Sequence, residues 1–275
     1  TAPSSSTNRK PRVPHVKTNG IETYYEVHGA GPPVLLAAGL GGAGTYWREQ
    51  IEPFARTHAV VLYDQRGAGR STHVSVCCIE ELMEDAIALL DALKLDRVHF
   101  VGHSTGAAIG QSLALDRPER LASLVLYSTV HRSDPFRRRM WQMRKDVLAR
   151  LGPKAYAQLT SLVLYPPAWV AANDARLTEE ETVAERMLSK PEIMASRIDA
   201  ILAHDRAEDL GRIRTPTLVL CARDDLMTPS YFSEDIARRI PDAELVLLDG
   251  GGHACSKTRA DEFNRHVLGF IAQHA

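Results

Sequence analysis

The sequence lacks the marks of a secreted, membrane or nucleic-acid-binding protein. Lysine and arginine together number 33 against 34 aspartate and glutamate, a net charge of -1, so no basic excess would attract a nucleic acid or an anionic membrane. No apolar run approaches the ~18 residues of a membrane span, and none near the start is typical of a signal peptide. We therefore expect a cytoplasmic protein that binds neither nucleic acid nor membrane.

Cysteine is also scarce. Only 4 of the 275 residues are cysteines, at Cys77, Cys78, Cys221 and Cys255. No pair has the spacing of a zinc finger, and adjacent cysteines such as the first two rarely bridge each other. We expect reduced thiols and no metal site.

Short apolar runs alternate with helical patterns along most of the chain. Apolar runs without internal alternation are typical of strands that are buried on both faces of a parallel sheet. Between them, 79–93, 230–239 and 258–272 have helical patterns. The expected strands are Ile21–Val27, Val34–Ala38, Ala59–Tyr63, Val98–Val101, Ser123–Tyr127, Thr217–Cys221 and Glu244–Leu248.

One stretch interrupts this alternation. Residues 131–206 contain no convincing strand and are rich in arginine, alanine, leucine and glutamate. The pattern predicts an α/β fold with a doubly wound, mostly parallel sheet and a helical lid inserted before the last two strands. The core is expected at 15–130 and 207–275, the cap at 131–206, and a disordered tail at 1–14.

The strongest chemical signal follows the strand that ends near Val101. Residues 102–106 read Gly-His-Ser-Thr-Gly and lead into a helix-compatible segment. A nucleophilic serine on a sharp strand-to-helix turn needs glycines on both sides, because side chains there would block the tight backbone. The pattern predicts Ser104 as a nucleophile.

A serine hydroxyl needs a base, and the base needs an orienting acid. With this turn the chain order is serine, acid, histidine, and the histidine follows the last strand. His253 lies in a glycine-rich loop after the expected final strand, which favours it among eleven histidines. Asp225, four residues before Pro229, is the favoured acid, and Asp224 is the alternative, with loop capping as its other role.

The developing oxyanion needs two preorganised N–H donors. Thr105, directly after the nucleophile, and Leu40, in the glycine-rich segment 39–44, are the expected donors. That segment lacks the Gly-Lys-Ser/Thr ending of a phosphate-binding loop and the spacing of a dinucleotide fingerprint. No metal or organic cofactor is implied.

Four motifs in the correct order resemble the α/β-hydrolase superfamily from about Val16 onward. Within it, the chain is most similar to the aminoacrylate or carbamate hydrolases of bacterial uracil degradation, and it also resembles 3-oxoadipate enol-lactonases and cofactor-free perhydrolases. Some members of the aminoacrylate group lack the serine, so the resemblance leaves the reaction open. The motifs are Gly39–Gly42, Tyr63–Ser71, Gly102–Gly106 and Gly251–His253.

The resemblance implies a serine hydrolase that cleaves an ester, lactone, amide or carbamate bond in a small molecule through an acyl-enzyme. A perhydrolase that uses the same triad, and a non-catalytic ligand receptor on the same fold, are the alternatives. The sequence leaves open whether the chain forms a homo-oligomer.

The lid is expected to shape the substrate pocket. Its aromatic residues have packing in the lid's own core as an alternative role. The arginines at 137–139 and 197 are candidates for binding a substrate carboxylate, although arginine runs are more often solvated. Asp64 and Arg66 are expected to form a structural pair near the site. The pocket candidates are Trp141, Tyr165, Trp169 and Arg197.

Overall fold

An eight-stranded sheet forms the centre of the protein in the computed structural model, which describes residues 14–274. The strand order is β1-β2-β4-β3-β5-β6-β7-β8. β2 is antiparallel to both of its neighbours, and the remaining pairs are parallel. The strands are β1 (His15–Thr18), β2 (Ile21–His28), β3 (Pro33–Ala37), β4 (Ala59–Tyr63), β5 (Val98–His103), β6 (Leu121–Tyr127), β7 (Thr217–Ala222) and β8 (Glu244–Leu248).

The apolar runs are continuous because consecutive side chains enter two different cores. In β3, Leu35 belongs to the core under one face of the sheet, whereas Val34 and Leu36 belong to the core under the other. β5 repeats the pattern with Phe100 and Val101. Burial of both faces is therefore what removes polar residues from these strands.

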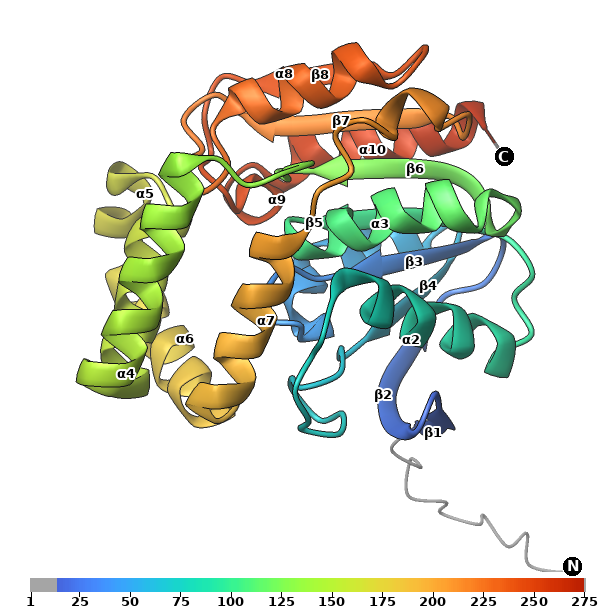
Figure 1. Ribbon diagram of the computed structural model, residues 1–275. Helices are drawn as coiled ribbons and strands as arrows, with labels where there is room; N and C mark the ends of the chain where they lie inside the picture. Colours follow the sequence, from blue (N-terminus) through green and yellow to red (C-terminus); the bar gives the residue numbers. More distant parts are fainter. Residues whose placement is uncertain (1–13, 275) are drawn as a thin grey trace, which may run out of the picture.

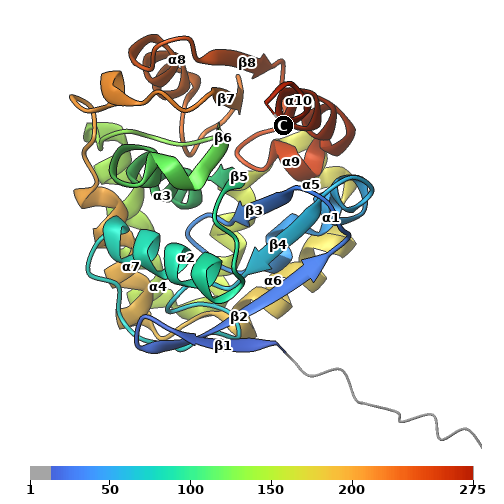
Figure 2. The ribbon, with the colours of Figure 1, turned by 90° about the vertical axis from the view of Figure 1, so that its right-hand side faces the viewer.

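Helices cover the two faces of the sheet (Figure 2). α2, α3 and α8 contribute to one core, and α1 and α10 to the other. These helices are α1 (Arg48–Ala55), α2 (Ile79–Ala92), α3 (Thr105–Asp116), α8 (Ser230–Arg239) and α10 (Ala260–Gln273), with a short α9 (Cys255–Thr258) before the last.

The expected lid consists of four helices between β6 and β7. Figure 1 shows that these helices gather beyond the carboxyl ends of the strands. They are α4 (Pro135–Leu164), α5 (Pro167–Ala172), α6 (Asp174–Met187) and α7 (Pro191–Ala203). Prolines begin three of them, where a missing N–H costs nothing. Gly152, with φ of +83°, breaks α4 into two segments.

The fold class is confirmed, with three local differences from expectation. α1 was not anticipated from the sequence. The last helical pattern is divided at Arg259 into α9 and α10. β8 was expected to be buried on both faces, but it is the edge strand and Glu244 and Leu245 are exposed, because no strand covers its outer side. The predicted tail at 1–14 lies outside the described residues except for Pro14.

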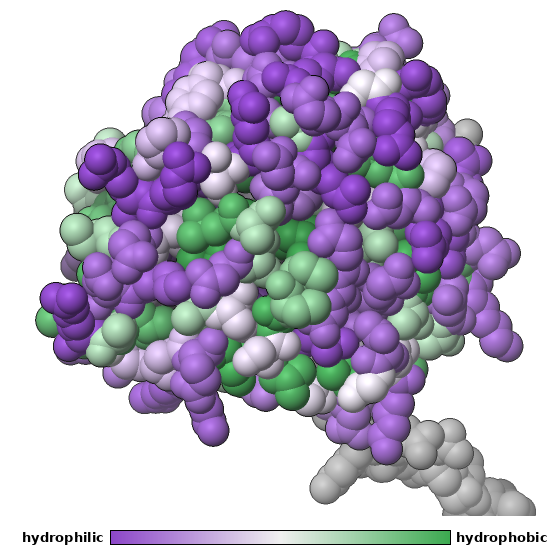
Figure 3. Space-filling model, viewed as in Figure 1, coloured by the Kyte–Doolittle hydropathy of each residue, from purple (hydrophilic) through white to green (hydrophobic). Residues whose placement is uncertain are grey.

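On the face of the molecule that Figure 3 shows, hydrophilic side chains predominate, and most of the hydrophobic ones lie in its middle and lower part. Within residues 14–274, no helix has the length and apolar character needed to cross a membrane.

Candidate active site

The turn between β5 and α3 holds Ser104 in a strained conformation. Its φ is +52° and its ψ is -111°, a region that costs a non-glycine residue about 1–3 kcal/mol. A Cβ on Gly106 would collide with the carbonyl of Ala37, and one on Gly102 would collide with Gly106. The two glycines thus let the start of α3 pack directly against β3, which leaves the serine at the carboxyl edge of the sheet.

His253 and Asp225 form the contact that is expected between a catalytic base and the acid that orients it. His253 Nδ1 lies 2.9 Å and 3.1 Å from the two carboxylate oxygens of Asp225. Ser104, Asp225 and His253 are only 6%, 3% and 2% exposed. With Nδ1 directed at the carboxylate, Nε2 is left as the nitrogen that can accept a proton.

Asp225 is held ionised although it is buried. Burial by itself raises its pKa, but the nearby charge of His253 and hydrogen bonds from His253 and Thr228 outweigh that effect and lower the pKa below its usual value. Oδ1 accepts from the N–H groups of Met227 and Thr228, both at 2.8 Å, and Oδ2 accepts from Thr228 Oγ1 at 2.8 Å. The carboxylate therefore keeps its negative charge for the imidazole.

Asp224, the alternative acid, contacts the histidine loop from a different side. Its carboxylate accepts from the N–H of Gly252 at 2.8 Å and from that of Gly251 at 3.2 Å. Both glycines have positive φ, so the loop depends on glycine and on this carboxylate for its shape. The geometry gives Asp224 a loop-capping position and gives Asp225 the contact with His253.

Two residues that the sequence did not single out as supports hold the backbone of His253. The carbonyl of His253 accepts from Tyr127 Oη at 2.9 Å and lies 3.0 Å from His103 Nε2. His103 stacks on Tyr46 with 4.4 Å between ring centroids. Burial and the adjacent His253 hold the pKa of His103 well below its usual value, so it stays a neutral, packed histidine.

The glycine-rich loop after β3 lies beside Ser104. A Cβ on Gly39 would lie 3.3 Å from that of Ser104, so the two backbones are close neighbours. Within residues 14–274, the N–H groups of Leu40 and Thr105 have no acceptor. Gln65, which the sequence did not indicate, holds the start of this loop through a hydrogen bond from Nε2 to Ala38 O at 2.7 Å.

Arg197 connects the lid to the glycine-rich loop at 39–44 and to the residues that follow β4. It extends from α7 and is fully buried, and each of its three nitrogens donates to the core: Nε to Leu40 O at 2.9 Å, Nη2 to Gln65 Oε1 at 2.6 Å, and Nη1 to Arg66 O. These bonds fix the peptide that follows the expected oxyanion donor. They favour a positioning role, while direct contact with substrate stays a prediction.

We expect Arg197→Met to lower kcat by about 10- to 100-fold with a smaller change in KM, because a misplaced oxyanion donor weakens transition-state binding more than ground-state binding. Steady-state kinetics on one ester would measure the split. Arg186→Met, a change of an exposed lid arginine, is the matched control. An equal loss of kcat in both variants, or an effect confined to KM, would contradict the positioning role.

The three aromatic pocket candidates occupy different places. Trp141 is buried in the large core between lid and sheet. Tyr165 stacks on Trp169 at 4.5 Å and packs against Ala254, next to His253. All three have packing partners, and contact with substrate stays a prediction for each.

The expected pairing of Asp64 with Arg66 is wrong. Asp64 accepts from the N–H of Gly44 at 2.8 Å and from Arg70 Nε at 3.0 Å. Arg66 instead binds Asp85, with two contacts of 2.7 Å. The tight turn directs the two side chains to opposite sides, so Asp64 supports the glycine-rich loop at 39–44 and Arg66 joins the turn to α2.

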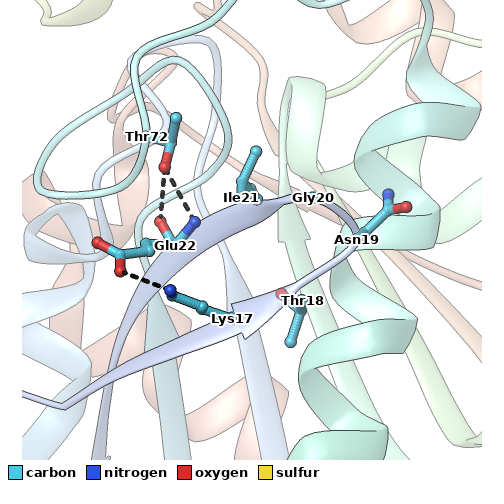
Figure 4. A pocket seen from close by; sticks show the side chains of 7 residues that line it. All are labelled: Lys17, Thr18, Asn19, Gly20, Ile21, Glu22 and Thr72. Carbon is cyan, nitrogen blue, oxygen red and sulfur yellow. Dashed lines mark hydrogen bonds and ion pairs between the residues drawn. The ribbon is translucent and has the colours of Figure 1, made fainter.

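None of the candidate residues lines the surface depression in Figure 4, which lies at the β1–β2 hairpin. Its lining residues are Lys17, Thr18, Asn19, Gly20, Ile21, Glu22 and Thr72. Within residues 14–274, no cluster of three histidine, cysteine, aspartate or glutamate side chains could hold a metal ion.

Known proteins share both the sequence and the fold. Residues 28–266 match the profile described as Alpha/beta hydrolase family. The chain is 42% identical to the "Putative carbamate hydrolase RutD" of Azorhizobium caulinodans, covering 95% of this chain and 99% of that one, and 40% identical to its namesake in Caulobacter sp. strain K31, covering 92% and 96%. The crystal structure of the enol-lactonase from Burkholderia xenovorans LB400 superimposes with a TM-score of 0.87 at 28% identity, covering 94% of this chain and 100% of that one. The chain belongs to the alpha/beta hydrolase family and is a hydrolase of that fold.

Proposed function

We propose that this hydrolase cleaves an ester, lactone, amide or carbamate bond in a small molecule by nucleophilic catalysis at Ser104. The observation that carries the proposal is the pairing of His253 with ionised Asp225 at 2.9 Å. The ring of His253 lies 4.6 Å from that of His103, the residue directly before a serine held at positive φ. Strain at a buried serine has a cost, and such strain is typical of functional sites.

The residues support a two-step mechanism. His253 Nε2 takes the proton of Ser104 Oγ as the oxygen attacks the carbonyl carbon, and Asp225 stabilises the resulting imidazolium. The N–H groups of Leu40 and Thr105 bind the oxyanion. Collapse expels the leaving group, protonated by His253, and leaves an acyl-enzyme. Water activated by His253 then releases the acid and restores the serine.

The bond to be cleaved is suggested by the relatives. The curated proteins carry the name carbamate hydrolase, and the structural relative is an enol-lactonase. Both names describe reactions in which an acyl carbon is attacked. The same triad can catalyse such an attack whether the leaving group is a nitrogen or an oxygen. We propose small carbamates, lactones and esters as the substrate range.

The test is a panel of 4-nitrophenyl esters, enol-lactones and small carbamates with the purified protein, scored by kcat/KM. We expect at least one class to turn over well above the rate of the Ser104→Ala variant. If the protein were a perhydrolase, the rate of peroxide-dependent halogenation in acetate would exceed the rate of hydrolysis of every substrate in the panel. Stoichiometric binding of all classes without turnover would contradict a hydrolytic role for this site.

A further inference from the structure

Two arginines on α4 are buried without a carboxylate partner. Arg137 and Arg144 are 1% and 4% exposed. Arg137 Nη1 donates to Met227 O at 3.1 Å, and Arg144 Nη1 lies 3.7 Å from Met227 Sδ. Arg144 Nη2 donates to Thr160 Oγ1 at 2.7 Å. Among residues 14–274 the acceptors of the two guanidinium groups are thus all uncharged, although an unpaired buried charge is costly.

The same chain pairs another arginine in the usual way. Arg66, which is also largely buried, contacts Asp85 at 2.7 Å and Glu81 at 2.8 Å. That arrangement satisfies the charge within the fold. Within residues 14–274, the guanidinium groups of the two α4 arginines have no equivalent contact with a carboxylate.

Further donors around these arginines lack a partner. Within the described part of the chain, four buried donor groups make no hydrogen bond: Arg137 Nε, Arg144 Nε, Trp141 Nε1 and Tyr156 Oη. They are close together, since the Arg144 guanidinium lies 4.7 Å from the Trp141 ring centroid and 4.8 Å from that of Tyr156. The Arg137 guanidinium lies 5.4 Å from the same indole. Several unsatisfied donors in one place are rare in a folded protein and call for an acceptor.

This cluster adjoins the proposed catalytic acid. Met227, which both arginines contact, donates its own N–H to Asp225 Oδ1 at 2.8 Å. Burial lowers the pKa of Arg137 to about 10, opposed by the charges of Asp225 and Asp134, so the guanidinium remains charged at neutral pH. A ligand group held here would therefore lie next to the acid loop.

We propose that Arg137 and Arg144, with Trp141 Nε1 and Tyr156 Oη, form a subsite that binds a carboxylate of the substrate. Two guanidinium groups with free Nε–H donors match the two oxygens of a carboxylate, which would also pair the buried charge. The inference rests on the proposed function and narrows it to small acyl compounds that carry a second, anionic carboxyl group. A substrate without that group leaves the four donors unpaired and loses their binding energy.

The test compares dicarboxylates with their neutral diamides. Succinate, glutarate and adipate, and the corresponding diamides, are titrated calorimetrically into the Ser104→Ala protein, and each is assayed as an inhibitor of 4-nitrophenyl acetate hydrolysis by the wild type. We expect at least one dicarboxylate to bind on the order of 10-fold or more tightly than its diamide and to inhibit competitively. Arg144→Gln and Arg137→Gln should each lower that dicarboxylate's affinity by about 10- to 100-fold, as expected for charge-assisted hydrogen bonds.

Arg150→Gln is the matched control, because Arg150 is an exposed residue on the same helix and is not among the arginines considered for substrate binding. It should leave dicarboxylate binding within about twofold of the wild type, since an exposed charge contributes little to a buried contact. Equal affinity for dicarboxylates and diamides, or equal losses in all three arginine variants, would overturn the proposal. Two further outcomes would show that the cluster binds a free anion rather than the substrate, and would overturn the proposal. One is acetate that binds as tightly as every dicarboxylate, and the other is a dicarboxylate that binds without competing with the ester.

Thermal unfolding separates loss of the subsite from misfolding. Without ligand, Arg144→Gln should melt no lower than the wild type, because it removes a buried charge that has no partner. The rise in Tm that the tight-binding dicarboxylate gives the wild type should be lost. A cooperative Arg144→Gln protein that keeps this rise would refute the subsite. Dicarboxylate binding to the Ser104→Ala protein does not depend on turnover. A failure of the proposed hydrolysis would therefore appear in the activity assay and leave this binding measurement unaffected.

Discussion

Replacing Ser104 by alanine is expected to lower kcat by about 10⁴- to 10⁶-fold with little change in the binding of substrate. The loss is large because the proposed mechanism has no other nucleophile. His253 would still be held by Asp225, so the variant would retain only the catalysis that comes from binding and from the oxyanion donors. Active-site titration and steady-state kinetics on the best ester of the panel would measure it.

Ser112→Ala is the matched control for this loss. Ser112 lies in the same helix, is also buried, and donates to Glu80 at 3.2 Å away from the turn. It should keep kcat within a few fold of the wild type. A Ser104→Ala protein that hydrolyses the ester at the wild-type rate would show that the reaction uses another nucleophile, and a loss shared by both variants would indicate damage to α3.

Asp225→Asn should have the second largest effect, a fall in kcat of about 10³- to 10⁴-fold. An amide can donate to His253 Nδ1, which favours the tautomer with its proton on Nε2. That tautomer cannot accept the proton of Ser104, so the serine stays unactivated. The pH-rate profile and kcat of the variant would measure the defect.

Asp224→Asn provides the paired comparison, because the two aspartates are neighbours in sequence and differ in their contacts. This substitution would remove part of the bonding to Gly251 and Gly252 but leave His253 paired with Asp225. We expect a decrease in kcat of about tenfold or less, with a lower Tm. If Asp224→Asn proved the more damaging change, the assignment of the catalytic acid would have to be reversed.

Local sequence signals predicted much of the fold and of the candidate site. The strands show in apolar runs such as Val98–Val101 because both faces of the sheet are covered. Ser104 can be identified in the sequence because the strained turn requires glycine at positions 102 and 106. His253 can be identified in the sequence because its loop follows the last strand and is rich in glycine. Each of these features depends on a few adjacent residues, which a single sequence displays.

The supports of the site depend on contacts between distant segments, which no single sequence displays. Arg197 is 157 positions from Leu40, whose carbonyl it binds, and its neighbours in sequence give no sign of that bond. Arg144 looks like an ordinary lid arginine until the structure places it beside Met227, 83 positions away. The pairing of Asp64 and Arg66 was wrong for the same reason, because turn geometry rather than adjacency decides where two charges point.

The most direct test of the central claim is covalent labelling of the wild type with a fluorophosphonate, which reacts with an activated serine, followed by intact-mass and peptide mass spectrometry. The account predicts one adduct per chain, on the peptide that contains Ser104, with hydrolysis lost in proportion to labelling. It also predicts no adduct in Ser104→Ala. An active enzyme that remains unlabelled, or a stoichiometric adduct on another residue with loss of activity, would contradict the assignment of Ser104 as the nucleophile.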